Sequence, residues 1–151
     1  LMTNLLLILL LVVGCKSPTE SKETSLCNED IEVELWGECY DVEETTSLNV
    51  THSELTGEIP SQIGDLINLT QLWLYHNEFT GEIPSEIGNL TNLIMFMVHG
   101  NELSGQVPEN ICDIYSNLVV FSIDDNNLCP PYPECLTEIN IGNQDTSECD
   151  D

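Results

Sequence analysis

The chain has 151 residues, and its 2 basic and 27 acidic residues give a formal net charge of −25. Both basic residues, Lys16 and Lys22, precede Cys27, and only Glu20 and Glu23 are acidic before it, so 25 acids follow without a Lys or Arg. This charge excludes a nucleic-acid-binding protein and electrostatic docking onto anionic lipid. The hydrophobic fraction of 41% is enough for one modest core, so we expect one compact domain with short appendages.

The N-terminal segment predicts export. Residues 5–13 read LLLILLLVV, a run too short for an ordinary transmembrane helix but typical of a secretory signal. The following Val12-Val13-Gly14-Cys15 resembles a bacterial lipobox, in which the cysteine is acylated and the signal is cleaved before it. The resemblance implies a signal peptide over 1–14, lipidation of Cys15 and a flexible tether over 15–26. The alternative is an ordinary signal peptide that contains a cysteine.

A repeat of 24 residues fills the middle of the chain. Residues 45–68 read TTSLNVTHSELTGEIPSQIGDLIN, residues 69–92 read LTQLWLYHNEFTGEIPSEIGNLTN, and residues 93–117 follow with one extra residue. A fourth copy begins at Leu118 and stops before Cys129. Each copy carries an alternating apolar pair, which is typical of a short strand with one face toward a core. These pairs are Leu48/Val50, Leu72/Leu74, Phe96/Val98 and Phe121/Ile123.

Asparagine recurs after each strand, at Asn77, Asn101 and Asn126, with Ser53 in the first copy. A side-chain amide both donates and accepts hydrogen bonds, so we expect a buried ladder that satisfies turning backbone.

The pattern LxxLxLxxNxLxGxIPxxIGxLxN resembles the plant-type leucine-rich repeat over residues 45–128. The resemblance implies an α/β solenoid, a right-handed coil of short parallel strands and 3-10 or irregular convex segments with disulfide-stabilised caps. The N-terminal cap would span 27–44, with Trp36 or Leu35 covering the first coil. The C-terminal cap and tail would span 129–151.

Six cysteines remain after Cys15, an even number that favours disulfides in an exported chain. Cys27 and Cys39 bracket the cap-like segment and are expected to pair. Cys135 lies 23 residues after Cys112, close to one repeat, so these two should lie on adjacent coils. We favour Cys112–Cys135 and Cys129–Cys149, and Cys129–Cys135 is the alternative.

The resemblance implies that the outward strand residues form a concave binding face. Its expected binding residues are Gln71, Trp73, Tyr75, His76, Met95, Met97 and His99. Aromatic and methionine side chains are typical of interface anchors. Alternatively, the aromatic residues only favour strand pairing.

Metal and catalytic sites find little support. His52 and His76 should lie about 5 Å apart on adjacent strands and could share Zn²⁺ or Cu²⁺. No carboxylate or cysteine lies in the same column, however, so we expect ordinary surface histidines, no metal and no cofactor. No catalytic motif is present, and no Ser-His-Asp set is expected from adjacent columns, so the sequence does not predict an enzyme.

The favoured function is a monomeric cell-surface recognition module that binds an extracellular protein or glycan through the concave face. It would be exported and either anchored by lipid at a bacterial surface or secreted. The alternative is a structural, polyanionic lipoprotein that binds divalent cations.

Overall fold

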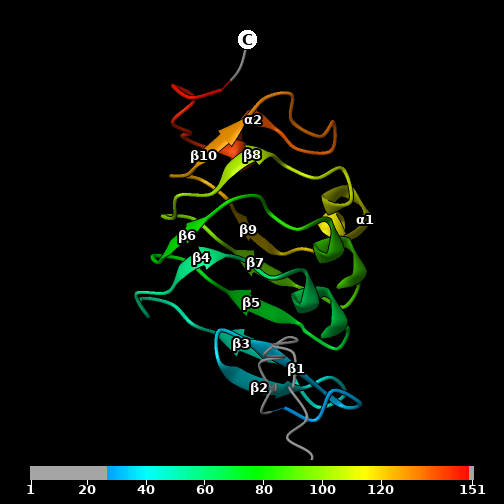
Figure 1. Cartoon of the computed structure of the whole chain (residues 1–151). Coiled ribbons are helices and arrows are strands. Elements are labelled where there is room, and N and C mark those ends of the chain that lie inside the picture. Colours follow the sequence, from blue (N-terminus) through cyan, green and yellow to red (C-terminus); the bar gives the residue numbers. More distant parts are fainter. Residues whose placement is uncertain (1–26, 150–151) are drawn as a thin grey trace, which may run out of the picture.

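The computed structural model describes residues 27–149 (Figure 1). The expected signal peptide 1–14, the lipidation site Cys15 and the tether 15–26 lie outside the described residues. Within 27–149, no helix is both long and apolar enough to cross a membrane.

Four short parallel strands stack side by side, one from each coil, in the order β3-β5-β7-β9 (Figure 1). Their register aligns Leu48, Leu72, Phe96 and Phe121, which confirms the stacking predicted from the repeat. The offset is one repeat at each step, so equivalent residues form columns across the sheet. The bounds are Ser47–Asn49 for β3, Gln71–Trp73 for β5, Met95–Met97 for β7 and Val120–Ser122 for β9.

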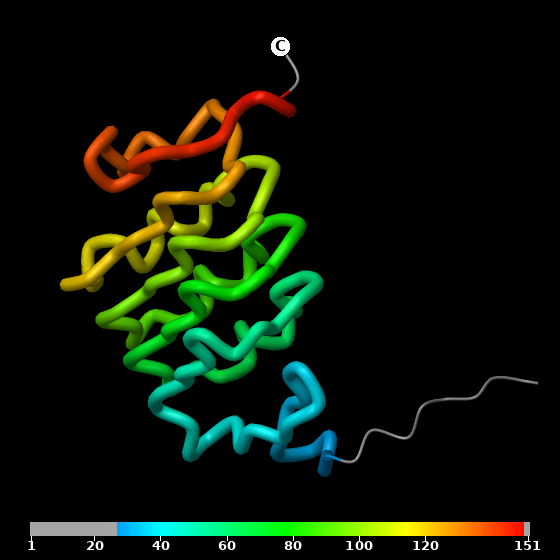
Figure 2. Tube along the Cα trace, turned by 90° about the vertical axis from the view of Figure 1, so that its left-hand side faces the viewer, coloured from blue at the N-terminus to red at the C-terminus, as the bar shows by residue number. Residues whose placement is uncertain are grey.

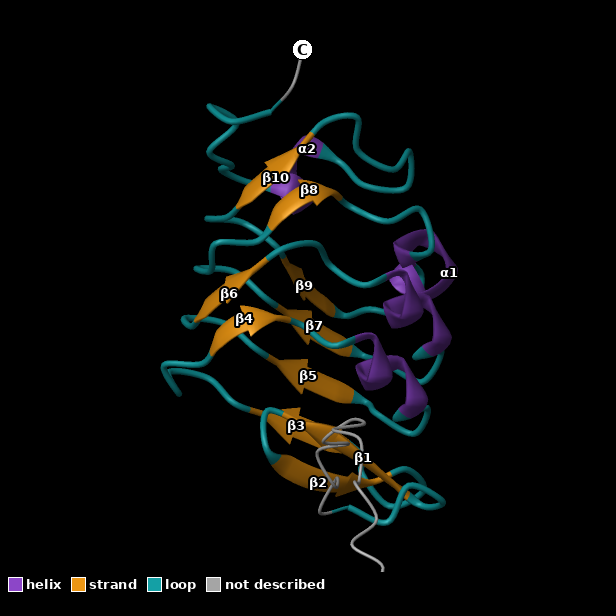
Figure 3. Ribbon diagram, in the orientation of Figure 1, coloured by secondary structure: helices purple, strands orange, loops and turns teal. Residues whose placement is uncertain are grey.

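A second wall of short strands and helices closes each coil (Figure 3). The sequence analysis predicted one strand per coil, but the structure adds a second strand after Ser53 or the asparagine of each coil, where the chain is extended beside its neighbour in the adjacent coil. Strand β4 (Thr56–Glu58) pairs with β6 (Glu78–Thr80), and β8 (Ser104–Gln106) pairs with β10 (Asn127–Cys129), all in parallel. The convex helices are the 3-10 helices η1 (Ser61–Asp65) and η2 (Ser85–Asn89) and the α-helix α1 (Ile111–Tyr115).

The coils stack on one another along the molecule (Figure 2). One cluster of buried apolar side chains runs through them, from Leu35 to Leu136. In the central coils both members of each predicted strand pair are fully buried: Leu72, Leu74, Phe96 and Val98. In the end coils Val50 and Phe121 are only half-buried. A terminal coil has a neighbouring coil on one side only, so it must depend on a cap.

The predicted asparagine ladder is present, and all three amides are buried. The Asn101 side chain accepts a hydrogen bond from Phe79 N–H at 3.1 Å and donates to the Leu74 and Val98 carbonyls at 3.1 and 2.9 Å. Asn77 and Asn126 make the equivalent bonds in their own coils. Each amide therefore bonds to its own coil and to the preceding one.

Gln144 extends this ladder into the C-terminal cap, which the sequence analysis did not predict. Its side chain accepts from Leu128 N–H at 3.1 Å and donates to the Ile123 and Ile141 carbonyls at 3.0 and 2.8 Å. It follows helix α2 (Glu138–Ile141), which packs near β9. The cap thus satisfies the last coil in the way that the next asparagine would.

The N-terminal cap is an antiparallel hairpin of β1 (Glu32–Leu35) and β2 (Glu38–Asp41). Leu35 is fully buried, and the Trp36 ring lies 5.1 Å from the Phe79 ring, so both expected residues cover the coils.

The structure contains three disulfides, Cys27–Cys39, Cys112–Cys135 and Cys129–Cys149, the pairings that the sequence favoured. Cys112 stands where the first two repeats have Gly64 and Gly88. A Cβ on Gly88 would lie 2.8 Å from the Asn110 carbonyl oxygen of the next coil, which explains the glycine. Cys112 lies on α1 of the third coil, where the C-terminal cap stands in place of a next convex helix, and there it forms a disulfide with Cys135.

Replacing Asn101 by Ala should lower the free energy of unfolding by about 1–3 kcal/mol, because the buried Phe79 N–H loses its acceptor. Chemical denaturation measures the change. Asn92→Ala is the matched control, since exposed Asn92 donates one hydrogen bond to the Ile67 carbonyl. Its cost should stay below about 1 kcal/mol. Equal losses of unfolding free energy in the two variants would contradict the view that the buried ladder is the main polar link between coils.

Gln144→Ala should destabilise the C-terminal cap by about 1–3 kcal/mol, because Leu128 N–H loses its acceptor. Hydrogen exchange at Leu128 should accelerate, while amides of the central coils should keep their protection. The exposed Gln106→Ala is the control. Unchanged exchange at Leu128 in the Gln144 variant would show that the ladder ends at Asn126.

Candidate functional site

The strand register places the predicted binding residues in two columns on the concave face, defined here as the outward side of β3, β5, β7 and β9. Gln71 pairs with Met95 in one column, and Trp73 pairs with Met97 in the next. These four side chains are half-buried rather than fully exposed. The fold therefore brings the predicted residues together and presents a partly shielded surface.

Trp73 differs from the exposed anchor that the sequence predicted. Its indole Nε1 is shielded from solvent and has no hydrogen-bond partner within the described chain. A buried N–H without an acceptor costs about 1–3 kcal/mol. The half-buried ring is therefore a packed part of the face that retains one unused donor.

Two apolar side chains extend this surface, and the sequence analysis did not include them. Ile94 and Val119 are 42% and 78% exposed. They lie on neighbouring coils, since Val119 N–H donates to the Ile94 carbonyl at 2.8 Å. The same position holds Thr46 and Thr70 in the earlier coils, so a switch from threonine to aliphatic residues was the available signal.

Three histidines and Tyr75 form a contiguous cluster just beyond the ends of β3, β5 and β7. The Tyr75 ring stacks on His99 with centroids 4.7 Å apart and an interplanar angle of 8°. His76 contacts Tyr75, His99 and His52 with centroids 5.4, 5.1 and 4.8 Å apart. The sequence placed His76 and His99 among the binding residues, and the structure adds His52 to the same group.

His99 also belongs to a hydrogen-bonded chain with Ser122 and Asp124. The Ser122 hydroxyl donates to the Asp124 carboxylate and lies 3.0 Å from His99 Nδ1. Serine, histidine and aspartate side chains therefore do meet here, which the sequence analysis did not expect, because Ser122 at the end of β9 and Asp124 just beyond it lie beside His99. The order differs from that of a hydrolase triad, since serine rather than histidine is central and its proton points to the carboxylate.

Burial lowers the pKa of His99 below its ordinary value, although the nearby Asp124 carboxylate opposes this shift. The imidazole is therefore neutral at neutral pH. A neutral ring suits the stacking on Tyr75 and adds no positive charge to the face.

The charged residues near the cluster are acidic. Residues 27–149 contain no Lys or Arg, and no ion pair forms within this part of the chain. Asp124 and Asp125 lie at one end of the concave face, on the coil next to His99 and Gly100. The surface attracts basic groups and cations.

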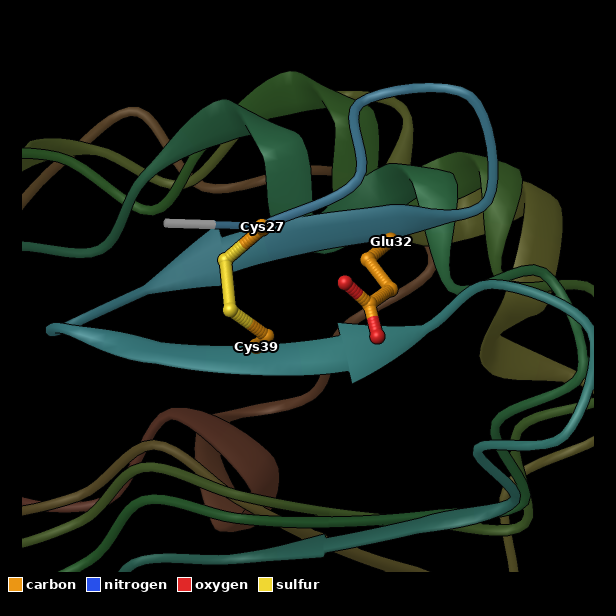
Figure 4. A group of neighbouring side chains, drawn as sticks. All are labelled: Cys27, Glu32 and Cys39. Carbon is orange, nitrogen blue, oxygen red and sulfur yellow. A yellow bond between two sulfur atoms is a disulfide. The ribbon is translucent and has the colours of Figure 1, made fainter. Parts of the chain in front are cut away.

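A separate group in the N-terminal cap resembles a metal site only at first sight. Cys27, Glu32 and Cys39 bring potential ligand atoms within 4.8 Å of one another (Figure 4). Both sulfurs are in a disulfide, so neither is a thiolate ligand. Glu32 accepts a hydrogen bond from Asn28 N–H at 2.8 Å, so the group is structural.

Comparison with known proteins shows similarity to leucine-rich repeat proteins. Residues 68–90 match the Leucine Rich Repeat family model, and no curated protein matches the chain. The BIR3–SERK2 complex from Arabidopsis thaliana is similar, with 28% identity and a TM-score of 0.61 over 66% of this chain and 55% of that chain. The Arabidopsis thaliana BIR2 ectodomain matches with 25% identity and a TM-score of 0.61 over 68% of this chain and 56% of that chain.

A third similar structure is PEPR1–AtPEP1, at 36% identity and a TM-score of 0.55 over 57% of this chain and 12% of that chain. The chain thus spans little more than half the length of the first two structures and a small part of the third. Together with the stacked coils, these matches show the leucine-rich repeat solenoid fold that the sequence predicted.

The lowered His99 pKa predicts a pH-dependent stability term. As pH falls below about 6.5, the unfolded chain binds the His99 proton before the folded chain does, so this contribution to stability is lost. The difference in unfolding free energy between wild type and His99→Asn should therefore decrease between about pH 7.5 and about pH 5.

Denaturant unfolding across that range measures the difference, and NMR titration follows His99 directly. Ser122→Ala is the control, because it keeps the half-buried imidazole and should retain the pH dependence. A difference that stays constant or grows on acidification would contradict the prediction.

Proposed function

We propose that this chain is a non-enzymatic recognition module that binds an extracellular protein or peptide through the concave face. The supporting observation is the continuous surface of Trp73, Tyr75, Met95 and Met97, aligned on adjacent strands and extended by Ile94 and Val119. Aromatic and methionine side chains supply much of the contact energy in protein interfaces. Two of the three similar structures described above are complexes, BIR3–SERK2 and PEPR1–AtPEP1.

The chemistry of the face suggests a partner with basic and hydrogen-bond-accepting groups. Asp124 and Asp125 lie at one end of the apolar surface, and no Lys or Arg of residues 27–149 neutralises them. The unused Trp73 N–H would gain an acceptor from a partner carbonyl. A glycan partner would use the same rings and acids, so it is the alternative ligand.

The three disulfides fit an exported protein, because such bonds persist in oxidising compartments. We further propose, from the sequence, that residues 1–14 are a signal peptide, that Cys15 carries the lipid anchor, and that the domain acts as a monomer. The segment 15–26 would hold the domain away from the membrane.

A polyanionic protein that binds divalent cations is the second candidate, and the 25 acids without a basic residue favour it. Binding of calcium would then relieve repulsion between carboxylates over the whole surface. In that case the effect of Ca²⁺ would not depend on Trp73 or Tyr75.

Peptides selected from a random library against the full-length chain should lose affinity for Trp73→Ala and Tyr75→Ala by more than about tenfold, as expected for interface anchors. Titration calorimetry measures the affinities. Gln62→Ala, exposed on η1 of the far wall, is the matched control and should stay within about twofold.

Circular dichroism melting shows whether each variant remains folded. Selected peptides that bind the folded Trp73 and Tyr75 variants as tightly as wild type would contradict a concave binding site. A glycan array run on the same variants separates the alternative ligand class.

A further inference from the structure

The first two coils repeat one short sequence just after the concave strand. Residues 52–54 read His-Ser-Glu, and residues 76–78 read His-Asn-Glu, one repeat apart. The third coil has Gly100 and Glu102 at these positions, and the fourth has Asp125 and Asn127. A histidine followed two residues later by a glutamate therefore occurs in the first two coils alone.

The structure brings these two copies together around one hollow. His52, Glu54, His76 and Glu78 line it with Asn77 at its base, and its volume is about 340 Å³. The two imidazole rings lie 4.8 Å apart between centroids with an interplanar angle of 31°. The sequence analysis found no carboxylate in the histidine column, but here Glu54 and Glu78 reach the same hollow from the neighbouring column.

The four side chains are available for a ligand. All four residues are exposed, and no hydrogen bond from the described chain involves either imidazole or either carboxylate. Tyr75 packs against both rings, at 5.8 Å from His52 and 5.4 Å from His76. A Cβ on Gly100 would lie 2.5 Å from His76 Nδ1, so the glycine of the third coil makes room for this ring.

The histidine position of the repeat has an unusual backbone conformation in all four coils, and no ligand is needed to explain it. His52, His76, Gly100 and Asp125 all have φ between +50° and +65°. Histidine, aspartate and glycine tolerate this left-handed region better than most residues. The fold therefore accounts for the conformation, while the unbonded imidazoles and carboxylates are the features that a ligand would use.

We propose that His52 and His76, together with Glu54 and Glu78, bind one divalent transition-metal ion, with Zn²⁺ as the best match. Two neutral imidazoles with carboxylate oxygens suit zinc, copper or nickel, whereas calcium prefers oxygen ligands alone. No three of these four residues bring their ligand atoms within 4.8 Å of one another as they stand, so the exposed side chains must rotate to close around the ion. The net charge of −25 favours cation binding, and residues 27–149 offer no Lys or Arg to compete. This proposal does not rest on the recognition proposal, although Tyr75 and His76 belong to both surfaces.

Titration of the full-length chain with Zn²⁺ against a chromophoric chelator tests the site. Wild type should bind one ion per chain, and His52→Asn and His76→Asn should each weaken binding by more than about tenfold. Asparagine tolerates the left-handed backbone, so these variants should fold. Acidification should weaken binding in the wild type, because protons compete for the imidazole nitrogens.

Two controls separate this site from the general acidity of the surface. Glu102→Gln removes the equivalent carboxylate from a coil without the histidine, and it should leave Zn²⁺ affinity within about twofold. Excess Ca²⁺ should not displace Zn²⁺. Selective Co²⁺ broadening of the His52 and His76 imidazole resonances would further support the assignment.

Three results would overturn the proposal. The first is Zn²⁺ affinity that is unchanged in the folded double variant His52→Asn/His76→Asn. The second is displacement of Zn²⁺ by equimolar Ca²⁺, which would assign binding to diffuse carboxylates. The third is loss of binding in His99→Asn equal to that in His76→Asn, which would assign the ion to a different pair of histidines.

Discussion

The fold depends on buried amides that join each coil to the one before it. Every strand of the stack is only three residues long, so no coil carries a ladder that would be stable alone. Asn77, Asn101 and Asn126 satisfy the buried backbone where each coil turns from one wall to the other. Since each amide bonds across the coil boundary, it sets the spacing and register of the whole stack.

This register explains how far the sequence could predict the structure. Because the repeat is constant, residues one repeat apart had to align, and the columns of the concave face follow from that alone. The favoured cysteine pairing has the same origin for Cys112 and Cys135, which lie almost one repeat apart. Properties that depend on the backbone period were therefore predictable.

Properties that depend on side-chain rotation or on non-repeating sequence could not be predicted. Ser122 and Asp124 belong to different columns, and only the actual rotamers show that both approach His99. Gln144 replaces an asparagine from outside the repeat, with one more methylene and a different approach, so no spacing predicted it. The partial burial of Trp73 likewise depends on its neighbours rather than on its position in a column.

The acidic composition makes the ends of the stack especially important. A chain without Lys or Arg from Cys27 onward cannot offset repulsion between its carboxylates with ion pairs, so apolar burial, amides and disulfides must do so. The caps accordingly combine these devices: Leu35 and a disulfide at one end, and Gln144 with two disulfides at the other. Ends held in this way allow a short solenoid to keep a defined face.

The two proposed sites share a residue, and this has a thermodynamic consequence. Tyr75 belongs to the proposed recognition surface and packs against both His52 and His76. An ion bound there would add positive charge to an acidic face and restrict the rings around Tyr75. Any resulting change in affinity for a partner would require an equal change in affinity for the ion, because coupling between two binding equilibria is reciprocal. The histidine pair would thus couple partner binding to metal binding, while the half-buried His99 remains neutral beside it.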